Sequence, residues 1–323
     1  MRTKPENEIT LDRAIALTCL AGAAAFSYGI RIWMMCLLAA GVSMLTELVC
    51  LYARRIPFGF RHLDAAVTGV VLVMMMPPTV PVSLLIMSCI FAIIIGRALF
   101  GGKDNPVIPA ASAGYCFAML NQRLQMTAFP ADFGRVRLLH IDRSLLTSGA
   151  TDLWNKSGSF PADSDTWLTG LPAQPIGTGS LLLLGVIALV LIFRRSASGW
   201  VILPMMLLMI AGNIALRFFR DPVLTAAAVC LTNQTLFAVI FLYGDPAIAP
   251  PNIAGMFFGV LSGAILVLLG AFYRIYDLPV LFSVIIAPAA AALRAMMQQQ
   301  SAPAKPKGGN RGKQSAAKKS GAA

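Results

Sequence analysis

The chain has 323 residues, of which 57% are hydrophobic and 12% are charged, and its mean hydropathy is +0.74. The charged share is about half of that in soluble domains, and one ordinary core cannot bury so much apolar surface, so the composition excludes both a soluble globular protein and a disordered one. The net charge of +12 would suggest nucleic acid in a soluble protein, but here membrane topology and a basic tail account for it.

Apolar runs without a charge define the elements in chain order, because a membrane-spanning helix needs about 20 mostly apolar residues. They predict an all-α polytopic membrane protein with about ten transmembrane helices. These are expected near residues 14–30, 32–53, 62–77, 81–99, 106–122, 178–193, 198–218, 222–243, 252–273 and 278–297. Pro77-Pro78 separates the third span from the fourth, and the proline-rich segment 244–251 separates the eighth from the ninth, since proline removes a backbone donor and stops a helix.

The order of these spans indicates two halves. Five spans precede the polar stretch 123–177 and five follow it, and each half has a proline corner after its third span. An odd number of spans in each half forces the halves to be inverted, so the pattern favours an inverted 5+5 repeat. We therefore expect a first membrane half at 1–122, a polar loop at 123–177, a second membrane half at 178–298, and a disordered basic tail at 299–323 that is solvated or touches anionic lipid.

Lysine and arginine in the loops predict the orientation. If the N-terminus is cytoplasmic, the inside segments carry 17 of these residues and the outside segments carry 9. We therefore expect both termini to be cytoplasmic and loop 123–177 to be extracytoplasmic. The six cysteines lie in apolar runs without zinc or disulfide spacing, which is typical of core residues and leaves open only a metal shared with another subunit.

The polar loop contains the tetrapeptide Ser148-Gly149-Ala150-Thr151. It resembles the S/T-G-A-T flavinylation motif in membrane proteins of the Rnf and sodium-pumping NADH:quinone reductase families, in which the last threonine carries FMN through a phosphoester. Glycine and alanine leave room for a phosphate and a transferase, and the threonine hydroxyl can be the acceptor. The alternative is that Thr151 is the N-cap of a helix, since threonine is frequent at that position.

Four further segments resemble the RnfD family and occur in family order on both sides of Thr151. They are 66–78, 91–102, 105–115 and 245–250, so the resemblance extends over residues 14–298. The chain departs from the family pattern where Ile108 replaces an asparagine, where Gly244 replaces a threonine, and in loop 101–106, which is one residue shorter. In the family these motifs surround a second, non-covalent flavin, so the departures concern that flavin and not the covalent FMN.

The resemblance implies cofactors and a set of site residues. The cofactors are covalent FMN and a second flavin, riboflavin, while no residue is expected to be catalytic or to bind metal. The implied cofactor-binding residues are Thr151, Ser148, Gly149, Ala150, Arg143, Asn105 and Asp245. FMN would perform the electron chemistry while the protein positions it. Arginine pairs well with a phosphoester, which favours Arg143, whereas Asp245 has an alternative role as a helix cap.

Glu47 is the one acid well inside an apolar run. A carboxylate buried in a membrane is costly unless it is paired or protonated, so Glu47 is a candidate for cation passage. It fits equally well at an interface beside Arg54 or Arg55. His62 is expected at an interface near Arg61.

By the same resemblance, the chain is the FMN-carrying subunit of an Rnf-type ferredoxin:NAD oxidoreductase complex in the inner membrane, relaying electrons coupled to Na+ or H+ translocation. The implied partners are the other Rnf subunits (A, B, C, E and G type), a flavin transferase and membrane lipid, but no nucleic acid. The sequence has no iron–sulfur ligand set or nucleotide fingerprint, so the chain is not expected to be an enzyme alone. Two alternatives stay open: a cofactor-free inverted-repeat permease and a non-catalytic scaffold subunit.

Overall fold

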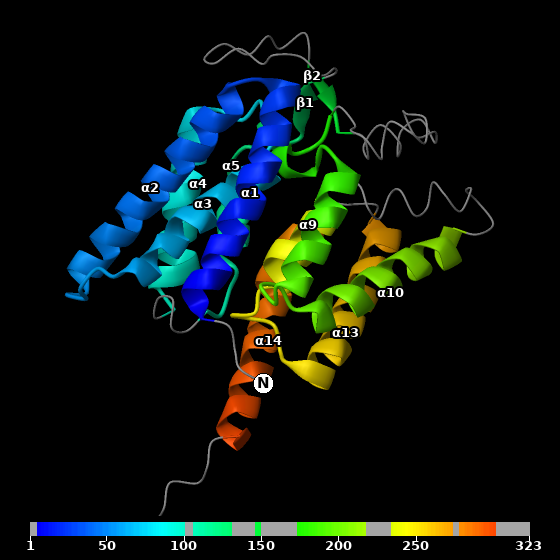
Figure 1. Cartoon of the computed structure of the whole chain (residues 1–323). Helices are drawn as coiled ribbons and strands as arrows, with labels where there is room; N and C mark the ends of the chain where they lie inside the picture. Colours follow the sequence, from blue (N-terminus) through cyan, green and yellow to red (C-terminus); the bar gives the residue numbers. More distant parts are fainter. Residues whose placement is uncertain are drawn as a thin grey trace, which may run out of the picture.

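The computed structural model describes residues 5–100, 106–130, 146–149, 173–217, 234–273 and 278–301. Within these residues the protein is almost entirely helical, and its helices run back and forth between two ends (Figure 1). In this described part, four helices are long and apolar enough to cross a membrane: α1 (Glu6–Tyr28), α2 (Arg31–Ala53), α13 (Asn252–Tyr273) and α14 (Leu278–Ser301). The expected all-α polytopic membrane fold is confirmed.

Shorter elements complete the described structure. The first half contains η1 (Phe60–Leu63), α3 (Asp64–Met75), α4 (Val82–Ile93), η2 (Ile94–Ala98) and α5 (Ala110–Asn121). The segment between the halves begins with α6 (Arg123–Met126) and ends in η4 (Ile176–Thr178). The second half contains α9 (Leu181–Phe193), α10 (Gly199–Arg217), α12 (Thr235–Ala238) and η5 (Val239–Tyr243). Two short strands, β1 (Ala128–Pro130) and β2 (Leu146–Ser148), lie between the halves in sequence.

The described helices follow the expected spans closely. Each expected span coincides with a helix, except that only the part of the eighth from residue 234 onward is described, so the count of ten and the inverted repeat stay predictions. Helix α1 begins at Glu6, before the expected start at residue 14, because acidic residues favour the first turn of a helix and need not lie outside it. Helix α14 continues to Ser301, into the segment expected as tail.

Helix α3 is short because of the double proline that follows it. Met76 has an extended backbone, with φ −90° and ψ 157°, directly before Pro77. Proline disfavours the helical conformation of the residue before it. The chain therefore turns through residues 77–81, and α4 starts after Pro81.

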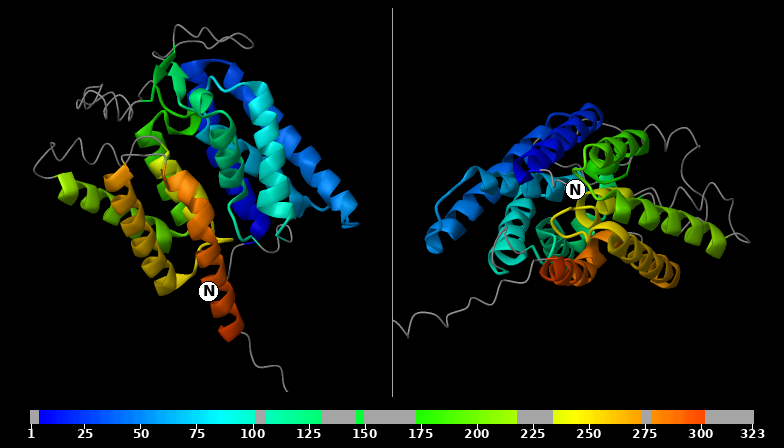
Figure 2. Two further views of the ribbon diagram at one scale, coloured as in Figure 1. Left: turned by 180° about the vertical axis from the view of Figure 1, so that it is seen from behind. Right: turned by 60° about the horizontal axis from the view of Figure 1, so that its bottom comes forward.

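The molecule has two ends, which we name by what they hold. The loop end holds the turn at Gly29, the corner 77–81 and both strands, whereas the termini end holds Glu6, the corner 244–250 and the last part of α14 (Figures 1 and 2). The start of α1 and the end of α14 thus share one end, and the strands lie at the other. Which end faces the cytoplasm stays a prediction.

The core lies where the two membrane halves meet. Its fully buried side chains come from helices of both halves and include Tyr28, Leu72, Met75, Tyr115 and Phe237. Ser283 of α14 donates a buried 2.6 Å hydrogen bond to the hydroxyl oxygen of Ser112 on α5. Helices α10 and α13 approach closely, since a Cβ at Gly259 would lie only 2.6 Å from the carbonyl oxygen of Val201. The Ser283–Ser112 hydrogen bond links the second half to the first, whereas the close approach of α10 and α13 packs the second half within itself.

Candidate functional site

The structure describes three of the seven residues that the sequence analysis assigned to cofactor binding. Ser148 and Gly149 lie at the loop end, and Asp245 lies in the corner at the termini end. The other four, which are Thr151, Ala150, Arg143 and Asn105, lie outside the described residues. The structure therefore does not bring Asp245 together with the tetrapeptide, and the two places are described separately.

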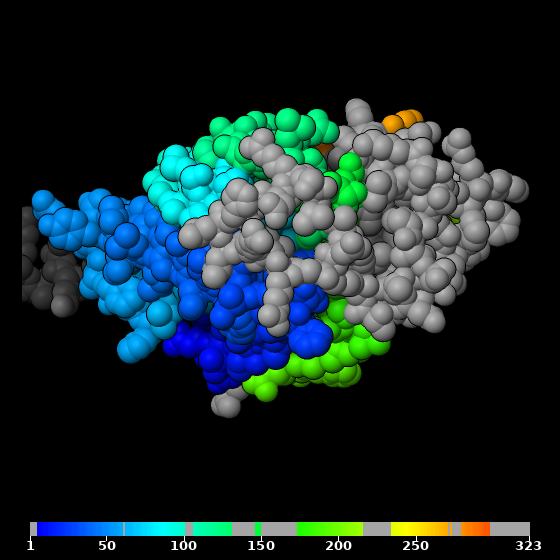
Figure 3. Space-filling model, turned by 90° about the horizontal axis from the view of Figure 1, so that it is seen from above, coloured from blue at the N-terminus to red at the C-terminus, as the bar shows by residue number. Residues whose placement is uncertain are grey.

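The two strands form a small antiparallel pair at the loop end. Ala128 lies opposite Ser148, and Phe129 lies opposite Thr147. Phe129 is only 8% exposed, whereas the residues of β2 and Gly149 are half-buried. Figure 3 looks down on this end, to which the chain comes from α5 through α6. The strand β2 thus carries Ser148, the first residue of the tetrapeptide, and Gly149 directly follows the strand.

Gly149 passes directly against the ring of Phe129. A Cβ at this position would lie 3.0 Å from Cε2 and 3.4 Å from Cδ2 of the ring, and 3.9 Å from the carbonyl oxygen of Ala173. Carbon atoms prefer separations of about 3.5–4.0 Å, so a larger side chain here would force the ring or the chain to move. The packing gives a local physical reason for glycine in the tetrapeptide.

Strand β1 is fastened to the membrane helices by the corner between α3 and α4. The hydroxyl of Thr79 in this corner donates a 2.5 Å hydrogen bond to the carbonyl oxygen of Ala128. Arg31, at the start of α2, donates to the carbonyl oxygens of Pro78 at 3.0 Å and Val80 at 2.9 Å. Arg31 is 2% exposed. This arginine, which was counted among the outside loop charges in predicting the orientation, is therefore a buried structural group.

The chain also returns to the helices at this corner after the polar loop. The backbone N–H of Ile176 donates a 3.1 Å hydrogen bond to the carbonyl oxygen of Met76. Ala173, which is buried, has a positive φ of 63°. The two described ends of loop 123–177 therefore both hydrogen-bond to the corner that the double proline creates, at Thr79 and at Met76. These bonds connect the loop end to the membrane helices.

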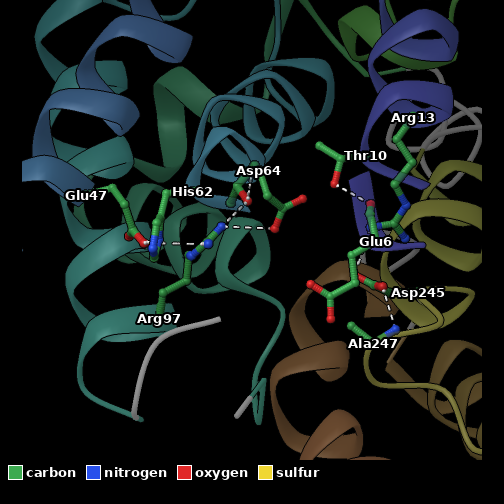
Figure 4. A network of polar contacts seen from close by, with 10 residues as sticks. Glu6, Thr10, Arg13, Glu47, His62, Asp64, Arg97, Asp245 and Ala247 are labelled. Carbon is green, nitrogen blue, oxygen red and sulfur yellow. Dashed lines mark hydrogen bonds and ion pairs between the residues drawn. The ribbon is translucent and has the colours of Figure 1, made fainter. Parts of the chain in front are cut away.

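At the termini end, Asp245 joins the second half to α1 (Figure 4). Its Oδ2 accepts a 2.9 Å hydrogen bond from the guanidinium of Arg13, and its Oδ1 accepts the backbone N–H of Ala247 at 2.9 Å. The second contact closes a local turn of the corner, in which an aspartate accepts from the backbone two residues on, and it is not the helix cap expected as the alternative for this residue. Arg294 of α14 donates to the carbonyl oxygen of Pro246 in the same corner. The corner at 245–246 is thus held by α1 through Arg13 and by α14 through Arg294.

Asp12 makes a second link between the halves at this end. Its Oδ1 accepts a 2.8 Å hydrogen bond from Nε of Arg194, and its Oδ2 accepts the hydroxyl of Ser196. The hydrogen bond to Asp12 and its negative charge raise the pKa of the Arg194 guanidinium above its ordinary value. The connection between α9 and α10 is thereby held on α1.

Glu47 belongs to a buried polar cluster, which we define as Glu47, His62, Asp64 and Arg97 (Figure 4). Nδ1 of His62 lies 3.2 Å from Oε1 of Glu47, and Arg97 lies 3.7 Å from the same oxygen. The Arg97 guanidinium also donates to Asp64 at 3.2 Å. Glu47 is 4% exposed and is paired with these groups rather than with the interfacial arginines at 54 and 55. Pairing offsets the cost of burying its charge.

Gln234 is a polar group in the core between the halves. Its Nε2 donates to the carbonyl oxygen of Met75, where α3 ends, and to the hydroxyl of Tyr115, both at 2.7 Å. Gln234 is 2% exposed, and its Oε1 has no hydrogen-bond partner among the described residues. The interrupted helix α3 is therefore bridged by a side chain from the second half.

The described residues contain no group of three or more histidine, cysteine or acidic side chains that could hold a metal ion. Their five cysteines are free, and two of them, Cys36 and Cys89, are buried. Sequence reasoning did not single out Thr79, Phe129, Gln234 or the Arg13–Asp245 pair. Their partners lie far away in the sequence, so only a fold could reveal them.

Comparison with known proteins covers nearly the whole chain. Residues 3–302 match the NQR2, RnfD, RnfE family. A relative from Yersinia pestis, named as the D subunit of an ion-translocating oxidoreductase complex, is 30% identical over 312 residues, which are 84% of this chain and 88% of the relative. The protein of that name from Shewanella frigidimarina is 26% identical over 314 residues, 86% and 89% of the two chains. In Ectopseudomonas mendocina the match is 32% identical over 156 residues, 47% of this chain and 43% of the relative.

The family match includes both membrane halves, both proline corners and the tetrapeptide at 148–151. The Yersinia pestis relative extends over most of the same length. The chain therefore belongs to the NQR2, RnfD, RnfE family.

Proposed function

We propose that this chain is the FMN-carrying membrane subunit of an Rnf-type complex that passes electrons between ferredoxin and NAD and couples the transfer to movement of Na+ or H+. The family match over residues 3–302 and the apolar helices support a membrane-embedded role. Relatives are named as the D subunit of an ion-translocating oxidoreductase complex, which supports the other subunits of such a complex as partners.

The tetrapeptide at 148–151 carries the proposal. Ser148 and Gly149 are half-buried residues at the loop end, on a strand pair fastened to the membrane helices. A cofactor attached close to this pair would stand at a fixed place beside one membrane face, as electron transfer requires. The positive-inside rule assigns this end to the outer face.

Attachment needs a flavin transferase and a flavin adenine dinucleotide donor. The hydroxyl oxygen of Thr151 forms a bond to the flavin-side phosphorus, the phosphoanhydride bond breaks, AMP leaves with the bridging oxygen, and the hydroxyl proton passes to solvent. FMN supplies one- and two-electron transfer when it is bound. The chain supplies the acceptor hydroxyl, and we assign Arg143 to the phosphoester, because a guanidinium pairs with phosphate oxygens through two donors.

Covalent flavin is tested directly on the full chain. The chain is co-expressed with a flavin transferase, separated on a denaturing gel and examined for ultraviolet-excited flavin fluorescence, and its peptides are mapped by mass. We expect a fluorescent band and an FMN adduct on the peptide that contains Thr151. The variant Thr151→Val should be dark while inserting normally. A dark band for the unaltered chain would remove the flavin from the proposal.

A cofactor-free permease is the second candidate, and the interrupted helix favours it. Short or broken helices are typical of transporters with inverted repeats, and α3 is a short helix that ends at Met75, where Gln234 of the other half donates to its last carbonyl group. A permease needs no flavin, so the same fluorescence measurement separates the two functions. A non-catalytic scaffold is tested by ferredoxin-dependent NAD reduction in membranes. If this activity is lost both in membranes that lack the chain and in membranes that carry Thr151→Val, the flavin itself is required and the chain is not a scaffold alone.

A further inference from the structure

The backbone at Gly149 is confined by the side chain of Phe129. The ring edge lies 3.0 Å from where a Cβ of residue 149 would be, and Phe129 itself is 8% exposed. Because aromatic side chains have few rotatable bonds, a buried ring of this kind is a rigid surface. The backbone that leaves β2 therefore packs against the Phe129 ring at Gly149, the second residue of the tetrapeptide.

The strand that carries the Phe129 ring is in turn fastened to the membrane helices. Phe129 lies in β1, and the carbonyl oxygen of the preceding residue, Ala128, accepts the 2.5 Å hydrogen bond from Thr79. Thr79 is buried in the corner whose carbonyl oxygens are held by Arg31. A continuous series of contacts thus leads from α2 through the corner and β1 to Gly149.

We propose that Phe129 is a positioning residue for flavin attachment, with Thr79 holding its strand in place. The ring fixes the path of the chain at Gly149, two residues before the acceptor Thr151 in the sequence, and attachment depends on this fixed position of Gly149. The inference rests on the proposed function, because it concerns the flavin that the function requires. It adds two residues outside the tetrapeptide to the attachment site.

A different explanation of Gly149 makes an opposite prediction. If the transferase itself needs glycine at this position, a larger residue blocks attachment whatever lies behind it. If the ring of Phe129 sets the limit, a smaller residue at 129 restores room. Leucine has no atom at the place of the ring Cε2, so Phe129→Leu relieves the contact that Gly149→Ala creates.

The test measures the flavin-labelled fraction of the full chain, co-expressed with a flavin transferase, as gel fluorescence divided by protein amount. Gly149→Ala should lower labelling several-fold, since a Cβ 3.0 Å from the ring forces the chain or the ring to shift by a few tenths of an ångström, and a displacement of about 1 Å of a reacting group can cost about 100-fold. Phe129→Leu alone should lower it by a smaller factor. The double variant Gly149→Ala/Phe129→Leu should recover to the level of Phe129→Leu.

Thr79→Val extends the test to the anchor of β1. Loss of the Thr79 hydroxyl should lower the labelled fraction. The matched control Thr18→Val should leave the labelled fraction unchanged, because the Thr18 hydroxyl donates to the Ala14 carbonyl of its own helix. The melting temperature of the detergent-solubilised chain is measured for every variant. We expect Phe129→Leu and Gly149→Ala to leave it within about 3 °C of the unaltered chain, since a loss of stability large enough to unfold the chain would move it further.

The outcomes separate the inference from the function on which it rests. A labelled unaltered chain with recovery in the double variant supports the role of Phe129. A labelled unaltered chain whose double variant is as dark as Gly149→Ala overturns it and assigns the glycine to the transferase. Normal labelling of Gly149→Ala also overturns it, because neither the ring nor the transferase then requires glycine at this position. An unlabelled unaltered chain refutes the proposed function, and the inference falls with it.

Discussion

Arg13 of α1 donates a 2.9 Å hydrogen bond to Asp245, which follows it by 232 positions and lies in the corner between η5 and α13. The pair fastens the first helix of the chain to the second membrane half at the termini end. The second carboxylate oxygen of Asp245 is held by the N–H of Ala247. Asp245 therefore has a structural role beside the flavin contact that the family resemblance implies, and the flavin contact stays a prediction.

Removal of either partner should destabilise the protein. The side chains are 11% and 23% exposed, so Arg13→Gln leaves a mostly buried carboxylate without its partner. We expect a loss of about 1–3 kcal/mol, less than for a fully buried pair because water reaches Asp245. Thermal unfolding in detergent measures this, and Arg54→Gln, at an exposed position of the same end, is the matched control.

A double-mutant cycle identifies the pair as the cause. The effects of Arg13→Gln and Asp245→Asn should sum to clearly more than the effect of the double variant, because both remove the same contact. If the two losses simply add, the contact contributes no coupling, and the link between α1 and the corner lies elsewhere, for example in Asp12 and Arg194.

Arg97 should be the residue of the buried polar cluster that is hardest to replace. It donates to Asp64 and Thr68 and lies 3.7 Å from Glu47. Arg97→Met leaves two acids near the core without their cation, and we expect about 3 kcal/mol of destabilisation. Arg97→Lys should restore only part, because one ammonium group cannot span the partners that a guanidinium reaches.

The yield of monodisperse protein in size-exclusion chromatography, together with the unfolding temperature, measures this series. Arg123→Met, at an exposed position in α6, serves as the control for general loss of a positive charge. Full recovery by lysine would show that charge alone matters at position 97 and that the geometry of the guanidinium does not.

Most helices were predictable because lipid imposes one local requirement. A helix that crosses a membrane must be apolar along its length, and the double proline at 77–78 ends a helix whatever its neighbours are. Both signals can be read from neighbouring residues alone. The expected start of α1 is too late because Glu6, Asp12 and Arg13 resemble loop charges in the sequence, whereas their partners lie on α1 itself or in the second half.

The contacts that build the site could not be predicted, since they join distant segments. Nothing in the local pattern pairs 128–130 with 146–148, directs Thr79 toward Ala128, or buries Arg31 under two carbonyl groups. The tetrapeptide at 148–151 was recognisable as a motif, but the ring that confines its glycine lies 20 residues earlier in the sequence. Glu47 was correctly recognised as a costly buried acid, while its partners His62 and Arg97 were not foreseen.

Gln234 should stabilise the junction between the halves through its two donated hydrogen bonds. Gln234→Leu keeps a similar volume but leaves the Met75 carbonyl and one contact of Tyr115 unsatisfied, and we expect a cost of about 1–3 kcal/mol in unfolding free energy. Tyr115→Phe should cost less, and its effect should shrink when Gln234 is already leucine. Thermal unfolding of the two single variants and the double variant checks both statements. Equal effects of Tyr115→Phe in both backgrounds would contradict the shared hydrogen bond.

The orientation of the two ends can be tested by the accessibility of single cysteines in a chain whose six native cysteines are replaced by alanine. Leu124 lies in α6 at the loop end and is 87% exposed, and Arg54 is an exposed residue after α2 at the termini end. With Lys and Arg concentrated on the inside, Leu124→Cys should react with a membrane-impermeant maleimide in spheroplasts, whereas Arg54→Cys should react only after lysis. The reverse pattern would place the loop end in the cytoplasm. The attachment strand pair would then face the wrong side of the membrane for an outward flavin, even if Thr151 carries one.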